Sequence, residues 1–286
     1  MSKLFHDMQD AARRSAERPA SSPALTQLLE SVGADAEAAR EATSTVLQGC
    51  RQLQLLPLER PILLPDDETP TTHGAFEAYR ALRTKLVRFQ GSDGIRSVVV
   101  TSAEANEGKT VSVLNLGLSM AQLPSQRVLL VDGDLRTSGL SELTGALETP
   151  GLAEILTGEA AFEAAPVSTN VPNLYIVGAG EAKQPAGDLF ARPRFQEFIG
   201  WCNEVFSMVL VDCPPMIGLA DFDIASAACD AVLVVVRAQK TKREILTTLE
   251  PKLQGKKLLG VLLNGQERQH HKTHYGYYYS KIGQKR

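Results

Sequence analysis

The residues of this 286-residue chain that are best suited to chemistry begin with Gly108-Lys109-Thr110. This sequence follows an apolar run, Ser97–Val100, and precedes a helical stretch over residues 111–123. A loop between a strand and a helix binds phosphate through backbone N–H groups and the helix dipole. In such a loop the lysine reaches the β- and γ-phosphates and the threonine hydroxyl binds Mg²⁺. We therefore predict a nucleotide site; a chance loop is the alternative. The predicted nucleotide-binding residues are Glu104, Ala105, Asn106, Glu107, Gly108, Lys109, Thr110, Val111 and Arg136.

Three aspartates follow two other apolar runs. Asp132 and Asp134 come after Val128–Val131, and Asp212 comes after Met208–Val211. Residues two apart in an extended segment face the same side, so Asp132 and Asp134 point together. Carboxylates at strand ends are costly to bury without a counter-ion, and Mg²⁺ is the natural one. One carboxylate can hold the metal while another accepts a hydroxyl proton; the alternative is that one aspartate caps the next helix. The candidate residues for catalysis and metal binding are Lys109, Thr110, Asp132, Asp134 and Asp212, and any of the three aspartates could take either role.

The elements that must position these residues are short apolar strands alternating with helices. A helix is expected over residues 75–89. Runs of four to six Val, Leu and Ile residues separated by helical stretches are typical of a parallel sheet covered on both faces. The sequence therefore predicts a doubly wound α/β domain, in which ligands bind outside the carboxyl ends of the strands. The expected strands are Ser97–Val100, Val128–Val131, Leu174–Val177, Met208–Val211, Ala231–Val236 and Leu258–Leu263.

Composition and charge narrow the class of protein. The chain is 43% hydrophobic and carries a net charge of −3, which argues against nucleic acid as a partner. Its four cysteines form no CxxC pair, which is typical of reduced thiols in a cytosolic protein. The sequence contains no apolar run long enough to span a membrane, and we expect no signal peptide, because residues 1–10 are mixed and polar. We expect a cytoplasmic protein that reaches the inner face of the plasma membrane only through a partner.

The chain divides into three predicted parts. Residues 1–72 read as a partly helical or disordered arm and linker, with helical stretches around residues 25–32 and 34–55 before a proline-rich segment. Residues 73–265 contain the alternating strands and helices. Residues 266–286 form a tail with four of the six tyrosines of the chain.

Taken together, these residues resemble the bacterial tyrosine kinases, the P-loop kinases of capsule and exopolysaccharide synthesis. The loop ending in Gly108-Lys109-Thr110 resembles the family's Walker A motif, residues 128–136 its Walker A′ motif and residues 209–215 its Walker B motif. Residues 151–158 and 172–180 also look like family segments. The resemblance covers residue 75 to the end and implies a MinD-like P-loop fold. It implies that Lys109 and Thr110 bind phosphate and Mg²⁺, Asp132 accepts the proton of a tyrosine hydroxyl, and Asp134 and Asp212 assist metal binding.

The tyrosine-rich tail is the second feature of this resemblance. The family's activity implies autophosphorylation, whereas an aromatic docking strip or a sticky tail is the alternative. Residues 266–286 hold five Lys or Arg and one Glu, a net charge of +4. Four phosphotyrosines would add roughly −6 to −8 and reverse this sign. The predicted autophosphorylation sites are Tyr275, Tyr277, Tyr278 and Tyr279.

A helical motif before the first strand completes the resemblance. Glu77, Arg80 and Arg83 are three residues apart and share one helix face. Such a face is usually solvated and internally paired. The spacing resembles the family's Glu-x-x-Arg-x-x-Arg subunit contact, which implies a ring-like homo-oligomer that phosphorylates tails in trans. The further implied partners are a separate transmembrane polysaccharide co-polymerase that activates the kinase and a cognate tyrosine phosphatase.

Two alternatives to a kinase remain at this point. One is a MinD- or ParA-like ATPase switch. That class carries a signature lysine five residues before the lysine of Gly-Lys-Thr, where this chain has Glu104. The other is a nucleotide-binding scaffold of a polysaccharide export complex, which only a test of activity distinguishes.

Overall fold

The fold is described by a computed structural model of the chain. The structure describes residues 47, 49–55, 62–64, 69, 72–148, 150–218 and 220–265. The chain consists of two compact units, residues 1–49 and residues 50–286, and the sheet belongs to the second. The tyrosine tail and most of residues 1–72 lie outside the described residues.

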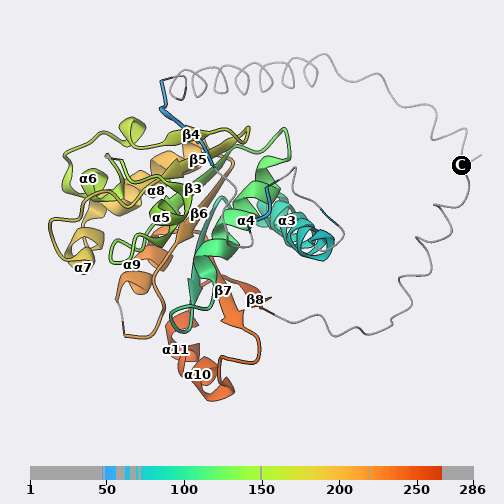
Figure 1. Ribbon diagram of the computed structural model, residues 1–286. Helices are drawn as coiled ribbons and strands as arrows, with labels where there is room; N and C mark the ends of the chain where they lie inside the picture. The colour runs from blue at the N-terminus through green and yellow to red at the C-terminus, as the bar shows by residue number, and fades with distance from the viewer. Residues whose placement is uncertain are drawn as a thin grey trace, which may run out of the picture. The chain divides into compact units, whose positions relative to one another are not determined.

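An eight-stranded sheet forms the centre of this unit (Figure 1). The strands lie in the order β1-β4-β5-β3-β6-β2-β7-β8, and pairs from β5 to β8 are parallel. All six predicted strands are present, so the predicted α/β fold with a mostly parallel sheet is confirmed. The strands are β1 Gln52–Leu53, β2 Ser97–Ser102, β3 Val128–Asp132, β4 Val167–Thr169, β5 Leu174–Val177, β6 Met208–Asp212, β7 Ala231–Arg237 and β8 Leu258–Asn264.

Two short strands at one edge of the sheet, β1 and β4, were not predicted from the sequence. Strand β4 pairs antiparallel with β5, and β1 pairs parallel with β4. The expectation of a helix over residues 34–55 is wrong at its end, because residues 52–53 are extended in β1. A strand of two residues has no detectable alternation. Leu55 and Leu63, which follow β1, are buried against the domain.

Helices cover both faces of the sheet (Figure 1). Helix α4 packs on β2, β3 and β6 and is itself covered by α3, whereas α8 and α9 pack on β6 and β2 from the other face. Because α4 lies between the sheet and α3, eleven of its residues are buried. The helices are α3 His73–Asp93, α4 Lys109–Ala121, α5 Gly139–Thr144, α6 Leu152–Thr157, α7 Ala186–Phe190, α8 Pro193–Val205, α9 Asp221–Ala228, α10 Arg243–Thr248 and α11 Glu250–Leu253, with a 3₁₀ turn η2 at Phe162–Ala164.

The central strands β2, β3 and β6 are buried along their whole length. Side chains on both sides of these strands therefore face helices, which explains why the runs are uniformly apolar instead of alternating. Because the three strands are parallel neighbours, their carboxyl ends lie side by side at one edge of the sheet. This edge receives the glycine–lysine–threonine loop and the three aspartates.

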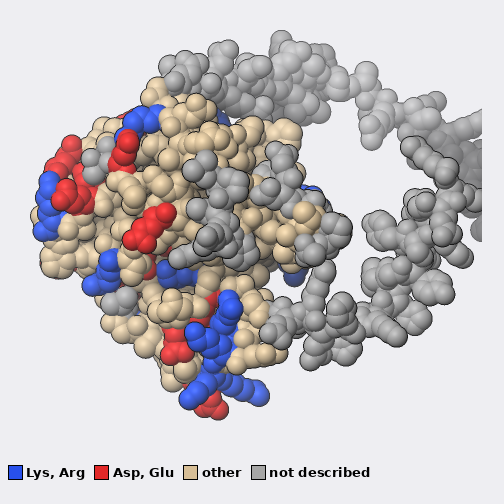
Figure 2. All heavy atoms as spheres, in the orientation of Figure 1, with Lys and Arg blue, Asp and Glu red and all other residues tan. Residues whose placement is uncertain are grey.

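The surface carries charges of both signs. Figure 2 shows acidic and basic side chains over the face that it draws, with Lys and Arg gathered near α10 and α11. Among the described residues, no helix has the length and apolar character needed to cross a membrane.

Candidate active site

The loop between β2 and α4 has the backbone that a phosphate site requires. Gly108 adopts φ 88° immediately before α4, and Asn106 adopts φ 64°. Both values lie in the left-handed region that glycine and asparagine tolerate best. The chain therefore turns sharply and presents the first N–H groups of a 13-residue helix to the loop. The start of α4 at Lys109 places the Lys109 and Thr110 side chains at this end.

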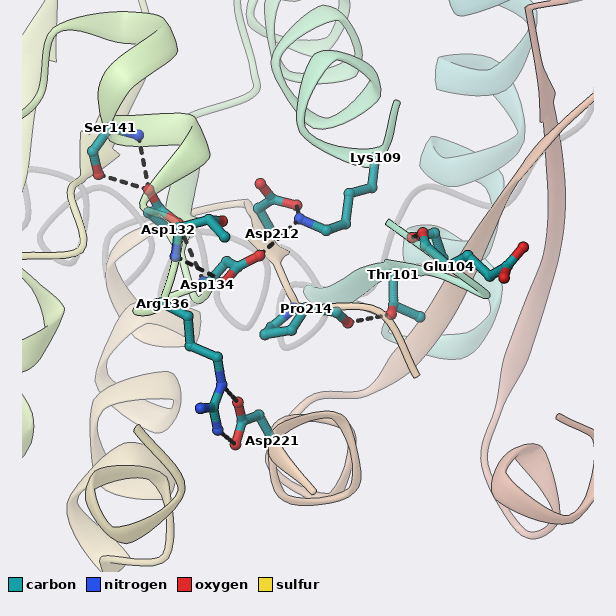
Figure 3. Close-up of polar contacts among 12 residues, drawn as sticks. Thr101, Glu104, Lys109, Asp132, Asp134, Arg136, Ser141, Asp212, Pro214 and Asp221 are labelled. Atoms are coloured by element: carbon teal, nitrogen blue, oxygen red, sulfur yellow. Dashed lines mark hydrogen bonds and ion pairs between the residues drawn. The ribbon is translucent and has the colours of Figure 1, made fainter. Parts of the chain in front are cut away.

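The side chains of Lys109 and the three aspartates converge beside this loop (Figure 3). Lys109 Nζ donates to Asp134 Oδ2 at 3.1 Å and lies 3.5 Å from Asp212 Oδ1. Asp132 Oδ1 accepts a hydrogen bond from the Asp134 N–H at 3.2 Å. All four side chains are buried or nearly so. The four residues predicted to be catalytic thus form one cluster.

Burial shapes the ionisation of this cluster. It raises the pKa of Asp212 to about 7, against the lowering by Lys109, and it also raises the pKa of Asp132, against hydrogen bonds from Ser141. Burial alone lowers the pKa of Lys109, but the carboxylates of Asp212 and Asp134 outweigh it and raise this pKa. Lys109 therefore stays positively charged. The charged forms of Asp132 and Asp212 are disfavoured by their burial.

The residues of the cluster fit a bound Mg²⁺. Within the described part of the chain, neither carboxylate oxygen of Asp212 accepts a hydrogen bond of normal geometry, although both are buried. The nearby Thr110 hydroxyl lowers the pKa of Asp212 without forming such a bond. Three carboxylates against one ammonium also leave an excess of negative charge that is costly to bury. Oxygen ligands of this kind are those that Mg²⁺ takes in proteins.

Ser141 is a member of the site that the sequence analysis missed. Its hydroxyl and its backbone N–H donate to Asp132 Oδ2 at 2.7 and 2.8 Å. The same hydroxyl accepts a hydrogen bond from the Ala179 N–H at 2.8 Å. These contacts hold the Asp132 carboxylate in one orientation. A serine nine residues after an aspartate carries no sequence signal, because only the turn before α5 brings the two together.

Arg136 lies apart from the phosphate loop in this structure. Its Nε atom pairs with Asp221 Oδ2 at 3.1 Å, at the start of α9 (Figure 3). Asp221 is buried and Arg136 is half exposed. The assignment of Arg136 to nucleotide binding stays a prediction. Glu104 and Ala105 are exposed at the rim of the loop, and Val111 is partly buried in α4.

The predicted subunit-contact motif lies on α3. Arg80 donates to Glu77 at 2.7 Å within the helix. Arg83 instead donates to the Ser119 carbonyl oxygen at 2.8 Å, at the end of α4. One residue of the motif, Arg83, thus contacts α4 of its own chain. Tyr275, Tyr277, Tyr278 and Tyr279 lie outside the described residues.

Comparison with known proteins identifies the family. A family described as an AAA domain matches residues 96–255. Tyrosine-protein kinase YwqD of Bacillus subtilis is 30% identical over 207 residues, which are 72% of this chain and 86% of that protein. The BceF tyrosine kinase domain is 26% identical, with a TM-score of 0.61 over 66% of this chain and 77% of that chain. MinD from Pyrococcus horikoshii, complexed with Mg-ADP, is 27% identical, with a TM-score of 0.51 over 61% of this chain and 72% of that chain.

These similarities agree with the geometry of the loop and the aspartate cluster. The MinD likeness places the domain among the P-loop nucleotide-binding proteins, and the extent of the YwqD match decides between kinase and ATPase switch. The chain belongs to the bacterial tyrosine-protein kinase family.

Proposed function

We propose that this kinase transfers the γ-phosphoryl group of ATP to the tyrosines of its own C-terminal tail, Tyr275, Tyr277, Tyr278 and Tyr279. The observation that carries the proposal is the convergence of Lys109 with Asp132, Asp134 and Asp212 beside the phosphate loop (Figure 3). Four tyrosines in a five-residue segment offer a dense acceptor close to the end of the chain.

The roles follow from the contacts of each side chain. Lys109 exchanges its aspartate partners for the β- and γ-phosphate oxygens when ATP enters, because those oxygens carry more charge. The tyrosine oxygen attacks the γ-phosphorus, the bond to the bridging β-oxygen breaks, and ADP leaves. The hydroxyl proton passes to Asp132, whose pKa is raised by burial, which makes this carboxylate a stronger base than an exposed one. Ser141 keeps Asp132 oriented for this transfer.

Thr110, Asp134 and Asp212 would hold Mg²⁺ in this proposal. The metal supplies charge neutralisation to the transferring phosphoryl group when it is bound. The buried Asp212 oxygens without hydrogen bonds support this assignment. Glu104, Ala105, Asn106, Glu107, Gly108, Val111 and Arg136 complete the proposed nucleotide site.

The wider function rests on membership of the family. We propose that the kinase phosphorylates tails in trans within a ring-like homo-oligomer, and that Glu77, Arg80 and Arg83 contribute to the subunit contact. A separate transmembrane polysaccharide co-polymerase activates it at the inner face of the membrane, and a cognate phosphatase resets it. Phosphorylation then regulates capsule or exopolysaccharide polymerisation and export. Residues 1–72 form the arm and linker, of which β1 and the buried Leu55 and Leu63 pack on the kinase domain. Residues 73–265 form the rest of that domain, and 266–286 form the phosphorylated tail.

Intact-mass spectrometry tests the proposal. The wild-type chain, Lys109→Ala and Asp132→Ala are measured before and after incubation with Mg-ATP. A ladder of phosphate additions on Tyr275–Tyr279 is expected in the wild type and in neither variant. The direct control is the chain with all four tail tyrosines changed to phenylalanine, which keeps the site and removes the acceptors.

ATP hydrolysis with no phosphate on the tail would show that the tail tyrosines are not the acceptors of this kinase. If neither appears, the cytoplasmic segment of a candidate activator is added. Tail phosphorylation that needs the activator would support the kinase with a separate partner.

A further inference from the structure

The side chain of Glu107 turns back into its own phosphate loop. Its Oε2 atom accepts hydrogen bonds from the N–H groups of Ala103 at 2.8 Å and Glu104 at 3.2 Å. The residue is almost completely buried. A carboxylate therefore occupies the first two N–H groups of the loop, and phosphate must use those that follow. The glutamate acts as an internal brace and leaves the rest of the loop for the nucleotide.

A second contact reaches this brace from the segment after β7. The hydroxyl group of Thr241 donates to the Oε1 atom of Glu107. The Thr241 oxygen also accepts a hydrogen bond from the Arg237 N–H at 3.1 Å, and the Thr241 N–H donates to the Arg237 carbonyl oxygen at 3.1 Å. The turn is thus closed on itself, so the hydroxyl is held in a fixed place.

A third contact comes from the end of β8. The side-chain amide of Asn264 donates to the backbone carbonyl oxygen of Glu107 at 2.8 Å. The backbone carbonyl oxygen of Asn264 accepts a hydrogen bond from the Ala238 N–H at 2.8 Å, which connects the asparagine to the turn after β7. A Cβ atom on Gly108 would lie 2.0 Å from the Asn264 amide nitrogen. Glycine at position 108 therefore serves two needs, the positive φ and the close approach of Asn264.

We propose that Thr241 and Asn264 are positioning residues for the phosphate-binding loop, and that both act through Glu107. Thr241 holds the side chain of Glu107 and Asn264 holds its carbonyl group, so the peptide that precedes Gly108 and Lys109 is fixed from two directions. The direction of this peptide sets where the following N–H groups and Lys109 point. A loop held in this way before ATP arrives loses less conformational freedom on binding.

A matched pair of substitutions at Thr241 tests this inference. Thr241→Val keeps the shape and removes the hydroxyl, whereas Thr241→Ser keeps the hydroxyl. We expect Thr241→Val to raise the Kd for ADP about tenfold, equal to about 1.4 kcal/mol, and Thr241→Ser to bind nearly as the wild type does. Isothermal titration of the full chain with ADP measures the Kd. Thr247→Val is the control, because among the described residues the Thr247 hydroxyl bonds only to carbonyl oxygens of its own helix α10.

A melting temperature measured without nucleotide separates positioning from general stability. Positioning predicts an altered Kd and a higher KM for ATP, with kcat at saturating ATP within about twofold of the wild type. A lower melting temperature with an unchanged Kd would overturn the proposal, as would an equal loss of affinity in Thr247→Val.

Asn264→Ala tests the second contact in the same titration. Each single change loosens the same residue, so the double variant should lose less affinity than the product of the two single losses. Strictly multiplicative effects would show that Thr241 and Asn264 act independently and would overturn their shared route through Glu107. Should Asn264→Ala fold poorly, Asn264→Ser serves as the shorter substitute in the same cycle.

Discussion

At the scale of single residues, the buried carboxyl group of Asp212 makes the stability of the nucleotide-free protein depend on pH. Burial raises its pKa from 3.8 to about 7. Between these values the folded chain holds a proton that the unfolded chain has released, so the free energy of unfolding falls as pH rises through this window. The loss is complete above about pH 7 and amounts to a few kcal/mol in order of magnitude.

Urea unfolding in EDTA, without nucleotide, measures this effect between pH 4 and pH 8. We expect the decline to be shallower in Asp212→Asn, because an amide does not titrate in this range. Asp188→Asn, at an exposed position, serves as the control and should follow the wild type. Parallel curves for all three proteins would show that Asp212 has no raised pKa.

At the scale of elements, Arg83 joins α3 to the end of α4. Its guanidinium donates to the Ser119 carbonyl oxygen at 2.8 Å and lies 3.4 Å from the Gln122 side-chain oxygen. The last carbonyl groups of a helix are unsatisfied within the helix and favour a nearby cation. Arg83, which the family motif assigns to a subunit contact, therefore also stabilises the packing of α3 on α4 within its own chain.

This arrangement predicts different effects along the motif. Arg83→Ala should lower the stability of the chain by about 1 kcal/mol, since a charge-assisted hydrogen bond is lost. Glu77→Ala should leave the melting temperature nearly unchanged and alter the oligomer, if the motif makes the proposed contact. Thermal unfolding and sedimentation velocity of both variants measure the two effects. An unchanged melting temperature for Arg83→Ala would contradict the role of Arg83 in joining α3 to α4.

At the scale of the whole molecule, the length of the tail decides which sites it can reach. Tyr275 is eleven residues beyond Asn264, so an extended chain spans at most about 40 Å. Strand β8 is four strands from β3 in the sheet, a distance of about 19 Å at the usual spacing. Chain length alone therefore permits a tail to reach its own Asp132. The proposed transfer in trans depends on the oligomer and requires its own test.

A mixing experiment supplies it. The chain with four tail phenylalanines acts as the enzyme, and Lys109→Ala acts as the substrate, because each lacks what the other provides. We expect phosphate on the Lys109→Ala tail after mixing with Mg-ATP, at a rate that rises with protein concentration. Lys109→Ala alone is the control. An unmodified tail in the mixture, with a phosphorylated tail in the wild type, would assign the reaction to a single chain.

Much of the sheet and of the active site could be predicted because the signals are local. Each of the six predicted strands is a continuous apolar run. In β2, β3 and β6 burial on both faces removes the polar positions, whereas β8 is apolar although part of it is exposed. Asp132 and Asp212 sit directly at strand ends, so parallel pairing of β3 with β6 brings them together. Strand β1 could not be predicted, because it pairs with β4, which lies far along the chain. Ser141 could not be predicted, because only the turn before α5 brings it to Asp132.

By itself, the sequence determined the order of the strands along the chain, the phosphate loop, the acidic residues and the tyrosines available to accept phosphate. Each of these is written in consecutive residues, so local propensity and spacing suffice to find it. Only the tertiary structure decided how Lys109 shares its charge between Asp134 and Asp212, and which residues brace Glu107. Thr241 and Asn264 are more than 130 residues from Glu107 along the chain. Thr241 and Asn264 lie near Glu107 because β2, β7 and β8 are parallel neighbours whose carboxyl ends lie side by side. No local sequence pattern predicts these contacts.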